Sequence, residues 1–354
     1  MTKALPEQRN HPELLAPAGN IESFFAALEH GADAIYVGHR HHSARALAAN
    51  FTLEEIARLR EYAHGHGVKL YVALNAIVRE DELADLIGVL SGLAQIQPDG
   101  LIIQDGAVAR LCRLYFPNLT IHASTLMTVH NRAGVEQLQT MGFQRVVLAR
   151  ELTIDELAHI AASTSLELEV FVHGALCFSY SGLCLASSFY GGHSSLRGRC
   201  AQPCRRLYRS GRQQGYLFSA NDLSAIELIP RLRKLGLAAF KIEGRMKPAS
   251  YVAPVVTAYR LVLDAAPDNE AEAIVEARQI LQEAYGRKPT RGFLVAEQHK
   301  EIITPHRSGA SGKLAAKVDW VRGNRMALRL RSPLTEGDRV RLDSDAEVEK
   351  AAFT

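Results

Sequence analysis

Eight short apolar runs, separated by amphipathic stretches, limit most strongly how this chain of 354 residues can fold. Each run is bounded by glycine or polar residues, and most are rich in branched or aromatic side chains, as buried parallel strands are. Eight strand–helix units in about 250 residues match a (β/α)8 barrel, so we predict an α/β protein with a TIM-type barrel over residues 12–285. The runs are residues 13–17, 33–37, 69–74, 100–103, 119–122, 145–148, 168–172 and 238–242.

The stretches between the runs carry helix-end signals. Thr52-Leu-Glu-Glu55 and Thr153-Ile-Asp-Glu156 have the spacing of capping boxes. Gly31 and Gly67 stand where a helix end favours positive φ. An open doubly wound sheet is the alternative architecture, but no G-x-G-x-x-G motif follows the first run, which weakens its nucleotide-binding version.

In a barrel, catalytic residues lie at the C-terminal ends of the strands. His173 directly follows the seventh run. Lys241 lies in the eighth run, and Glu243 and Arg245 follow its end. Glu243 offers a carboxylate for proton transfer, and Arg245 offers a guanidinium for a carboxylate or phosphate. We predict these four residues as catalytic; the alternative is that Glu243 and Arg245 form a buried ion pair that only braces the barrel.

Four of the five cysteines follow the seventh run: Cys177, Cys184, Cys200 and Cys204. Such thiolates can enclose an iron–sulfur cluster or a zinc ion. Structural zinc sites favour pairs separated by two to four residues, and only the second pair has that spacing, so the pattern favours a cluster. Four unrelated thiols are the remaining alternative.

The N-terminal residues are too polar for a secretory signal, and no apolar run approaches a membrane span. We therefore expect a cytoplasmic protein without membrane contact, in which disulfides are disfavoured. The fifth cysteine, Cys112, is expected in the core of a helix. Histidines at His39, His41 and His42 are expected to be solvated, with metal binding as the alternative.

Six arginines and no acidic residue lie between His193 and Gly215, although the net charge of the chain is only +3. This stretch, which includes Arg205 and Arg206, would meet phosphates or a small dicarboxylate, or offset the charge of a cluster. Residues 173–222 form the predicted cysteine insert, with an extra strand and turn at 216–222. Residues 291–354 are predicted as a small β-rich domain whose abrupt end is typical of a fragment.

Several motifs, in this order, resemble the collagenase-like peptidase U-32 family over about residues 12–265. The His-Gly-Ala-Leu-Cys form at residues 173–177 is most similar to the RNA hydroxylase branch, which acts on tRNA uridine or 23S rRNA cytidine. A sister branch hydroxylates the ubiquinone ring without oxygen. The motifs are residues 14–19, 31–38, 121–124, 169–177, 180–187 and 241–245.

The resemblance implies a [4Fe-4S] cluster on the four clustered cysteines and oxygen-independent hydroxylation of an RNA base, with prephenate as a cosubstrate. Leu126 replaces the usual glutamine and Asn221 replaces a lysine; both positions are expected to face the substrate. The rivals are a peptidase, a redox-sensing or scaffold protein, and hydroxylation of a quinone precursor. Neither H-E-x-x-H nor G-x-S-x-G occurs, which weakens the peptidase. The predicted substrate-binding residues are His122, Arg205, Arg206 and Asp222.

Overall fold

The computed structural model describes residues 11–284, 286–296, 301–306, 315–323, 325–331, 333–335, 340–342 and 352–353. The chain divides into two compact units, Met1–Ser311 and Gly312–Thr354. No helix among the described residues combines the length and apolar character that a membrane span requires.

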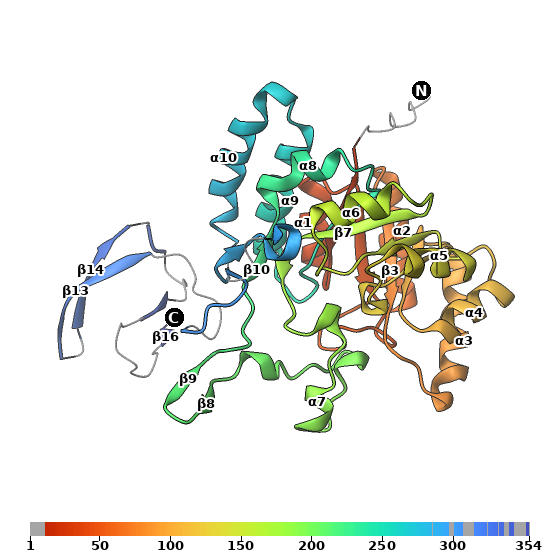
Figure 1. The fold of residues 1–354 in the computed structure, drawn as a ribbon, viewed down its shortest axis with the longest axis horizontal. Helices are drawn as coiled ribbons and strands as arrows, with labels where there is room; N and C mark the ends of the chain where they lie inside the picture. The colour runs from red at the N-terminus through yellow and green to blue at the C-terminus, as the bar shows by residue number, and fades with distance from the viewer. Residues whose placement is uncertain are drawn as a thin grey trace. The chain divides into compact units, whose positions relative to one another are not determined.

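Eight parallel strands close into a barrel in the first unit (Figure 1). Each strand pairs with the next along the chain, and the last strand, β11, pairs with both β7 and β1. This closure confirms the predicted barrel and excludes the open sheet. The strands are β1 (Glu13–Pro17), β2 (Ala34–Gly38), β3 (Lys69–Leu74), β4 (Gly100–Ile103), β5 (Ile121–Ala123), β6 (Arg145–Val147), β7 (Glu167–Ala175) and β11 (Ala239–Ile242).

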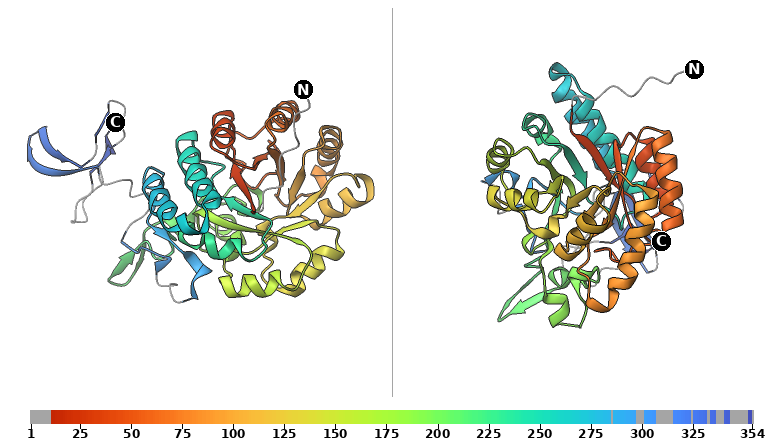
Figure 2. Two further views of the ribbon diagram at one scale, coloured as in Figure 1. Left: turned by 90° about the horizontal axis from the view of Figure 1, so that it is seen from above. Right: turned by 90° about the vertical axis from the view of Figure 1, so that its right-hand side faces the viewer.

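Helices surround the strands (Figure 2). Thr52 and Thr153 form the predicted capping boxes of α2 and α6, and Gly31 and Gly67 have φ of 96° and 72°. The helices of this layer are α1 (Ile21–Glu29), α2 (Leu53–Gly65), α3 (Leu83–Ile96), α4 (Gly106–Tyr115), α5 (Arg132–Thr140), α6 (Ile154–Ala161), α8 (Ile229–Arg233), α9 (Ala249–Asp264) and α10 (Glu270–Leu281).

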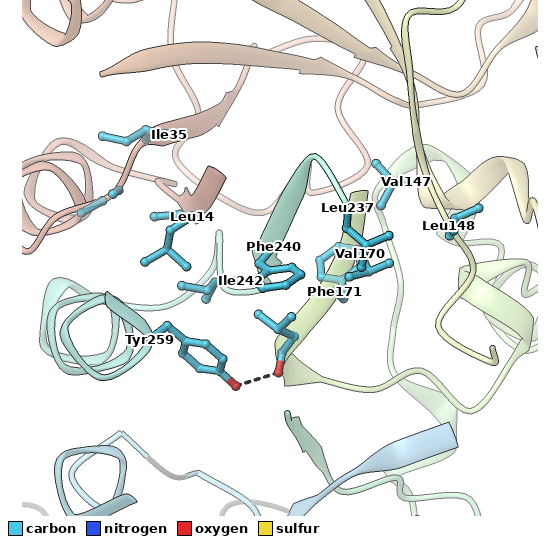
Figure 3. Packing of buried hydrophobic residues seen from close by; sticks show 14 of the residues in the cluster. Leu14, Ile35, Val147, Leu148, Val170, Phe171, Leu237, Phe240, Ile242 and Tyr259 are labelled. Atoms are coloured by element: carbon cyan, nitrogen blue, oxygen red, sulfur yellow. Dashed lines mark hydrogen bonds between the residues drawn. The ribbon is translucent and has the colours of Figure 1, made fainter. Parts of the chain in front are cut away.

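The main hydrophobic core lies between the strands and the helices. Phe240 and Ile242 of β11 pack towards Tyr259 of α9, as Figure 3 shows. The Tyr259 hydroxyl donates to the carbonyl of Val172 at 2.7 Å, so even this buried polar group is paired. Cys112 lies in the same core, where burial raises the pKa of its thiol to about 12, as expected of an inert packing residue.

Residues 176–224 leave the barrel after β7 and form the cysteine insert. It contains α7 (Ala186–Phe189) and a hairpin of β8 (Tyr208–Ser210) and β9 (Gln213–Gly215), which lie on one side of the barrel (Figure 1). It returns through β10 (Asp222–Ser224), which pairs antiparallel with the end of β7 and parallel with β12 (Pro289–Thr290). The end of the insert is therefore part of the barrel sheet.

Segments after β12 also belong to the first unit, although the sequence grouped residues 291–354 together. The backbone amides of Asn221 and Tyr216 donate to Ile302 O and Pro305 O, each at 2.7 Å. The second unit contains the antiparallel pairs β13 (Ala316–Arg322) with β14 (Arg325–Leu330) and β15 (Val340–Arg341) with β16 (Ala352–Phe353). The predicted β-rich domain, residues 291–354, lies partly outside the described residues.

Candidate active site

Charged side chains meet where β2 and β11 end, and we call five residues the mouth cluster: Tyr36, Ser43, Arg45, Glu243 and Arg245. Glu243 Oε1 accepts a hydrogen bond from Arg45 Nη2 at 2.9 Å, and its Oε2 lies 3.5 Å from the Tyr36 hydroxyl. Arg245 is buried and donates to Ser43 Oγ at 2.7 Å. The alternative of an ion pair between Glu243 and Arg245 is therefore wrong, because Glu243 pairs with Arg45 instead.

The two charges contributed after β11 are stabilised very differently. Burial by itself would raise the pKa of Glu243, but the guanidinium groups of Arg45, Arg150 and Arg245 lower it to about 2. Burial lowers the pKa of Arg245 to about 10, and within the described part of the chain no carboxylate forms an ion pair with it. Glu243 is thus ionised at neutral pH and a weak base, whereas Arg245 is a buried cation suited to an anionic ligand.

Gly38, the last residue of β2, leaves the space that Arg245 occupies. A Cβ at this position would lie 2.4 Å from Arg245 Nη1 and 2.3 Å from Asn50 Oδ1. Asn50 Oδ1 is buried and has no hydrogen-bond partner among the described residues. A buried cation and an acceptor without a partner among the described residues therefore both lie against Gly38.

Arg45 is a site residue that sequence reasoning missed. It lies in the loop after β2, for which the sequence-based prediction considered only the three histidines. Two of those histidines, His41 and His42, instead contact Asp85, each at 3.0 Å. The available signal was position alone, since a loop after a barrel strand opens onto the catalytic face.

The cysteine insert is tied to the barrel near this mouth. Glu151, which follows β6, accepts bonds from both the amide and the hydroxyl of Ser181 at 2.7 and 2.6 Å. Within the insert, Arg205 donates to Leu176 O at 2.9 Å and to Ser219 Oγ at 3.0 Å, and so joins the beginning of the insert to its end. Cys177 lies close enough to Arg45 to act on its charge. The insert and the mouth cluster are therefore neighbours.

The four predicted cluster cysteines are close to one another and have polar surroundings. Burial raises the pKa of Cys204, Arg205 lowers it, and the thiols of Cys177, Cys200 and Cys184 raise it again. The amide of Gln202 donates to Cys200 Sγ at 3.4 Å. Such sulfur-directed amides and a nearby cation suit a thiolate-bound cluster, so the donor set fits the group that the sequence predicted.

A single metal ion is a poorer match. The described residues contain no group of three or more His, Cys, Asp or Glu side chains placed to hold one. In a tetrahedral zinc site, bonds of about 2.3 Å bring the sulfurs to about 3.8 Å from each other. In a polynuclear cluster each thiolate binds a separate iron, which relaxes that requirement.

Three predicted residues lie deeper in the barrel. Lys241 is buried, bonds to Glu169 Oε1 at 2.7 Å and stacks over the ring of Tyr36. Burial, with the charges of Arg145 and Lys241, holds the pKa of His122 well below its usual range. His173 is buried against Tyr259 of α9, with 5.5 Å between ring centroids. These positions favour supporting roles, and the catalytic and substrate assignments of the three remain predictions.

The buried His173 should make stability depend on pH. Burial, with the charge of Lys247, lowers its pKa to about 3, so the unfolded chain takes up a proton near pH 6.5 and the folded chain does not. This contribution is complete above pH 6.5 and is lost as the pH falls towards 3. Lowering the pH from roughly 7.5 to 5.5 should therefore reduce the free energy of unfolding by about 1.4 kcal/mol.

Urea unfolding of the wild type and of His173→Phe at these two pH values measures that contribution. The variant starts from a lower stability, because it loses the contact with the Tyr259 hydroxyl, but its pH-dependent loss should be smaller by the stated amount. Equal losses in the two proteins would show that His173 is protonated in the folded state. The pH-dependent contribution of His122 is the same in both proteins and cancels in the comparison.

Residues of the insert separate into anchors and exposed cations. Arg197 pairs with Glu82 and Arg205 holds backbone carbonyls, so neither is free to meet RNA. Asp222 is buried and pairs with Arg287 at 3.0 Å. The substrate assignments of Arg205 and Asp222 are thus unsupported by the geometry. The exposed arginines are Arg199, Arg206, Arg209 and Arg212.

The two departures from the family pattern have different surroundings. Asn221 is buried, donates to Glu301 O at 2.7 Å and accepts from Thr304 Oγ1 at 3.0 Å. The expectation that it faces substrate is wrong, because its amide joins the insert to the segment after β12. Leu126 instead lies next to Gly182, between the first two cysteines, where a Cβ on the glycine would approach it to 2.5 Å.

Known proteins match most of this chain. The family model described as Peptidase family U32 matches residues 19–304. The tRNA hydroxylation protein P1 of Bacillus subtilis is 38% identical over 267 residues, covering 72% of this chain and 63% of that protein. The 23S rRNA 5-hydroxycytidine C2501 synthase of Escherichia coli is 37% identical over 295 residues, covering 81% and 43%. A collagenase of Porphyromonas gingivalis is 30% identical over 325 residues, covering 85% and 78%.

The chain spans less than two thirds of the length of the first two of these relatives. The family match nevertheless extends from just after β1 to the segment that follows β12, and so includes the other seven strands of the barrel, the mouth cluster and the cysteine insert. It confirms the resemblance inferred from the motifs: the chain belongs to peptidase family U32.

Proposed function

We propose that this protein catalyses the oxygen-independent hydroxylation of an RNA base, a uridine of tRNA or a cytidine of 23S rRNA. The observation that carries the proposal is the mouth cluster, in which the buried Arg245 has no carboxylate partner among the described residues and the cysteine insert lies alongside. The names of two relatives, which refer to tRNA hydroxylation and to a hydroxycytidine in 23S rRNA, support the choice of substrate.

In this proposal Cys177, Cys184, Cys200 and Cys204 hold a [4Fe-4S] cluster, which when bound supplies one-electron transfer. The protein's own contribution is to orient the reactants. Glu151 fixes the insert against the barrel, and Arg205 holds the beginning and the end of the insert together. The base must enter from the side on which the barrel strands end, because the interior of the barrel is filled by side chains such as Tyr36, Tyr71 and Ile102.

Arg245 is the residue that we propose binds the acidic cosubstrate, prephenate. A guanidinium pairs well with a carboxylate, and a buried one gains the most from such a partner. Asn50 Oδ1 lies beside it without a donor, where the cosubstrate hydroxyl would satisfy it. Glu243 remains ionised and keeps Arg45 in place across the mouth, rather than acting as an acid.

The deciding experiment compares RNA nucleosides from cells that contain or lack the gene. The deletion strain should lose one pyrimidine nucleoside that is heavier by one oxygen atom, in tRNA or in 23S rRNA, under anaerobic growth as well. Wild-type protein should restore it and the Cys200→Ala variant should not. Identical nucleoside profiles in the two strains would refute the proposal.

Peptide hydrolysis is the rival activity, because one relative is named a collagenase. Incubation of the purified protein with denatured collagen tests it directly. We expect no cleavage products beyond those seen with the Cys200→Ala variant. Defined cleavage by the wild type, inhibited by metal chelation, would favour the rival.

The exposed arginines should make RNA binding depend on salt. Each phosphate contact on a single strand contributes about 0.7 to the slope of log K against log salt. The triple variant Arg206→Ala, Arg209→Ala and Arg212→Ala should therefore reduce that slope by about 2. Arg110→Ala on the exposed face of α4 is the matched control and should change nothing. An unchanged slope in the triple variant would contradict this role.

A further inference from the structure

The cysteine insert exposes large apolar side chains that globular proteins normally bury. Phe189 and Tyr190 are 82% and 72% exposed, the highest values for any large hydrophobic residue that the structure describes. Leu185, just before them, is 68% exposed. Single exposed apolar residues are unremarkable, but a contiguous exposed group next to a predicted cofactor site marks an interaction surface.

The two aromatic rings are held in a defined arrangement. Their centroids lie 5.0 Å apart and their planes make an angle of 85°, an edge-to-face pair. Ser187, in the same short helix α7, is buried, and its hydroxyl accepts a hydrogen bond from the amide of Ala201 at 3.1 Å. The helix is thereby fixed to the segment that carries Cys200, and the rings are anchored beside the cysteines.

The exposed charges of the same insert select the partner. Arg199 directly precedes Cys200 and is exposed, and Arg206, Arg209 and Arg212 are exposed further along the insert. Residues 193–215 contain no Asp or Glu. Exposed aromatic rings together with exposed guanidinium groups are the chemistry by which proteins bind single-stranded nucleic acid, with bases on the rings and phosphates on the cations.

We propose that Phe189 and Tyr190 form a stacking platform for unpaired bases that flank the target nucleotide, so that the RNA is bound as a single strand. A duplex could not use it, because its base faces are covered by neighbouring bases. The platform holds the strand beside the cysteine insert while the target base enters the mouth. This inference rests on the proposed function and adds to it the form of RNA that is recognised.

The test measures binding of a labelled oligoribonucleotide to the intact, iron-containing protein by fluorescence anisotropy without air. Stacking contributes about 1–3 kcal/mol per base, so Phe189→Ala with Tyr190→Ala should weaken binding at least 10-fold. Phe189→Leu should also weaken it, because leucine keeps apolar area but cannot stack, whereas Phe189→Trp should retain affinity. Tyr115→Ala is the matched control, since Tyr115 is 69% exposed on α4, away from the insert.

Three outcomes would overturn the platform: equal affinity for the strand and for its duplex, unchanged affinity in the double variant, or wild-type affinity in Phe189→Leu. Loss of self-association in the double variant, with RNA affinity intact, would identify the rings as a contact between copies of this chain instead. Nucleoside analysis separates the two proposals. If the double variant hydroxylates RNA as well as the wild type, the platform alone fails; if the wild type hydroxylates no RNA, the proposed function fails.

Discussion

Replacing any one of Cys177, Cys184, Cys200 or Cys204 by alanine should remove most of the iron from protein purified without air. The intact protein should hold about four irons and four sulfides per chain, since each thiolate ligates one iron of a [4Fe-4S] cluster. Losing one ligand exposes that iron to solvent and destabilises the whole cluster. Iron and sulfide assays, with the visible absorption spectrum, measure the effect, and hydroxylation should fall with the iron.

Cys112→Ala is the control for these variants. Cys112 is buried in α4, and burial keeps its thiol protonated, so its loss should leave the iron content unchanged. The cluster assignment would be wrong if anaerobic protein contained stoichiometric zinc in place of iron. It would also be wrong if Cys112→Ala lost as much iron as the other four variants.

Arg245→Met should abolish prephenate binding and hydroxylation without lowering the stability of the protein. The buried guanidinium of Arg245 has its pKa lowered to about 10, which means that the fold disfavours its charge. At neutral pH the lowered pKa corresponds to roughly 3 kcal/mol of destabilisation. Removing the charge should therefore leave the free energy of unfolding equal or higher. A buried cation that costs stability, and forms no ion pair with a carboxylate in the described part of the chain, is what we expect of a residue that binds an anionic ligand.

Arg145→Met provides the contrast within the same barrel. Arg145 is also buried, but it pairs with Glu13 at 3.1 Å, Glu167 at 2.7 Å and Glu169 at 3.5 Å. Breaking such a network leaves the buried Glu169 with Lys241 as its remaining cation and Glu13 with Lys69, and should cost about 3–5 kcal/mol. Urea unfolding measures both variants, and the rise in Tm on adding prephenate measures binding. If Arg245→Met is as destabilised as Arg145→Met, or still responds to prephenate, Arg245 is structural.

The barrel was predictable because its signals are local. Runs such as Lys69–Leu74 and Gly100–Ile103 became strands with the predicted bounds. Buried parallel strands must be apolar on both faces, and helix ends must satisfy their free amides, so both leave marks in consecutive residues. The clustering of four thiols was equally local, and the spacing needed no structure to be noticed.

The mouth cluster depended on tertiary structure. Arg45 is separated from Glu243 by most of the chain, and only closure of the barrel between β11 and β1 brings the loop after β2 beside the end of β11. Sequence order suggested instead that Glu243 would pair with Arg245, two residues away. In the folded protein the charge of Glu243 then raises the pKa of Arg45, whereas burial lowers the pKa of Arg245.

The sequence by itself thus determined the strands, the helix caps and the set of thiols, since these follow from side-chain periodicity and spacing along the chain. Only the tertiary structure decided which arginines of the insert are exposed and which, like Arg205, donate hydrogen bonds to backbone carbonyls. It also decided that Asn221 is an internal contact and that His173 packs on α9. Hydrogen-bond partners and burial depend on residues far apart in the chain, and folding is what brings them together.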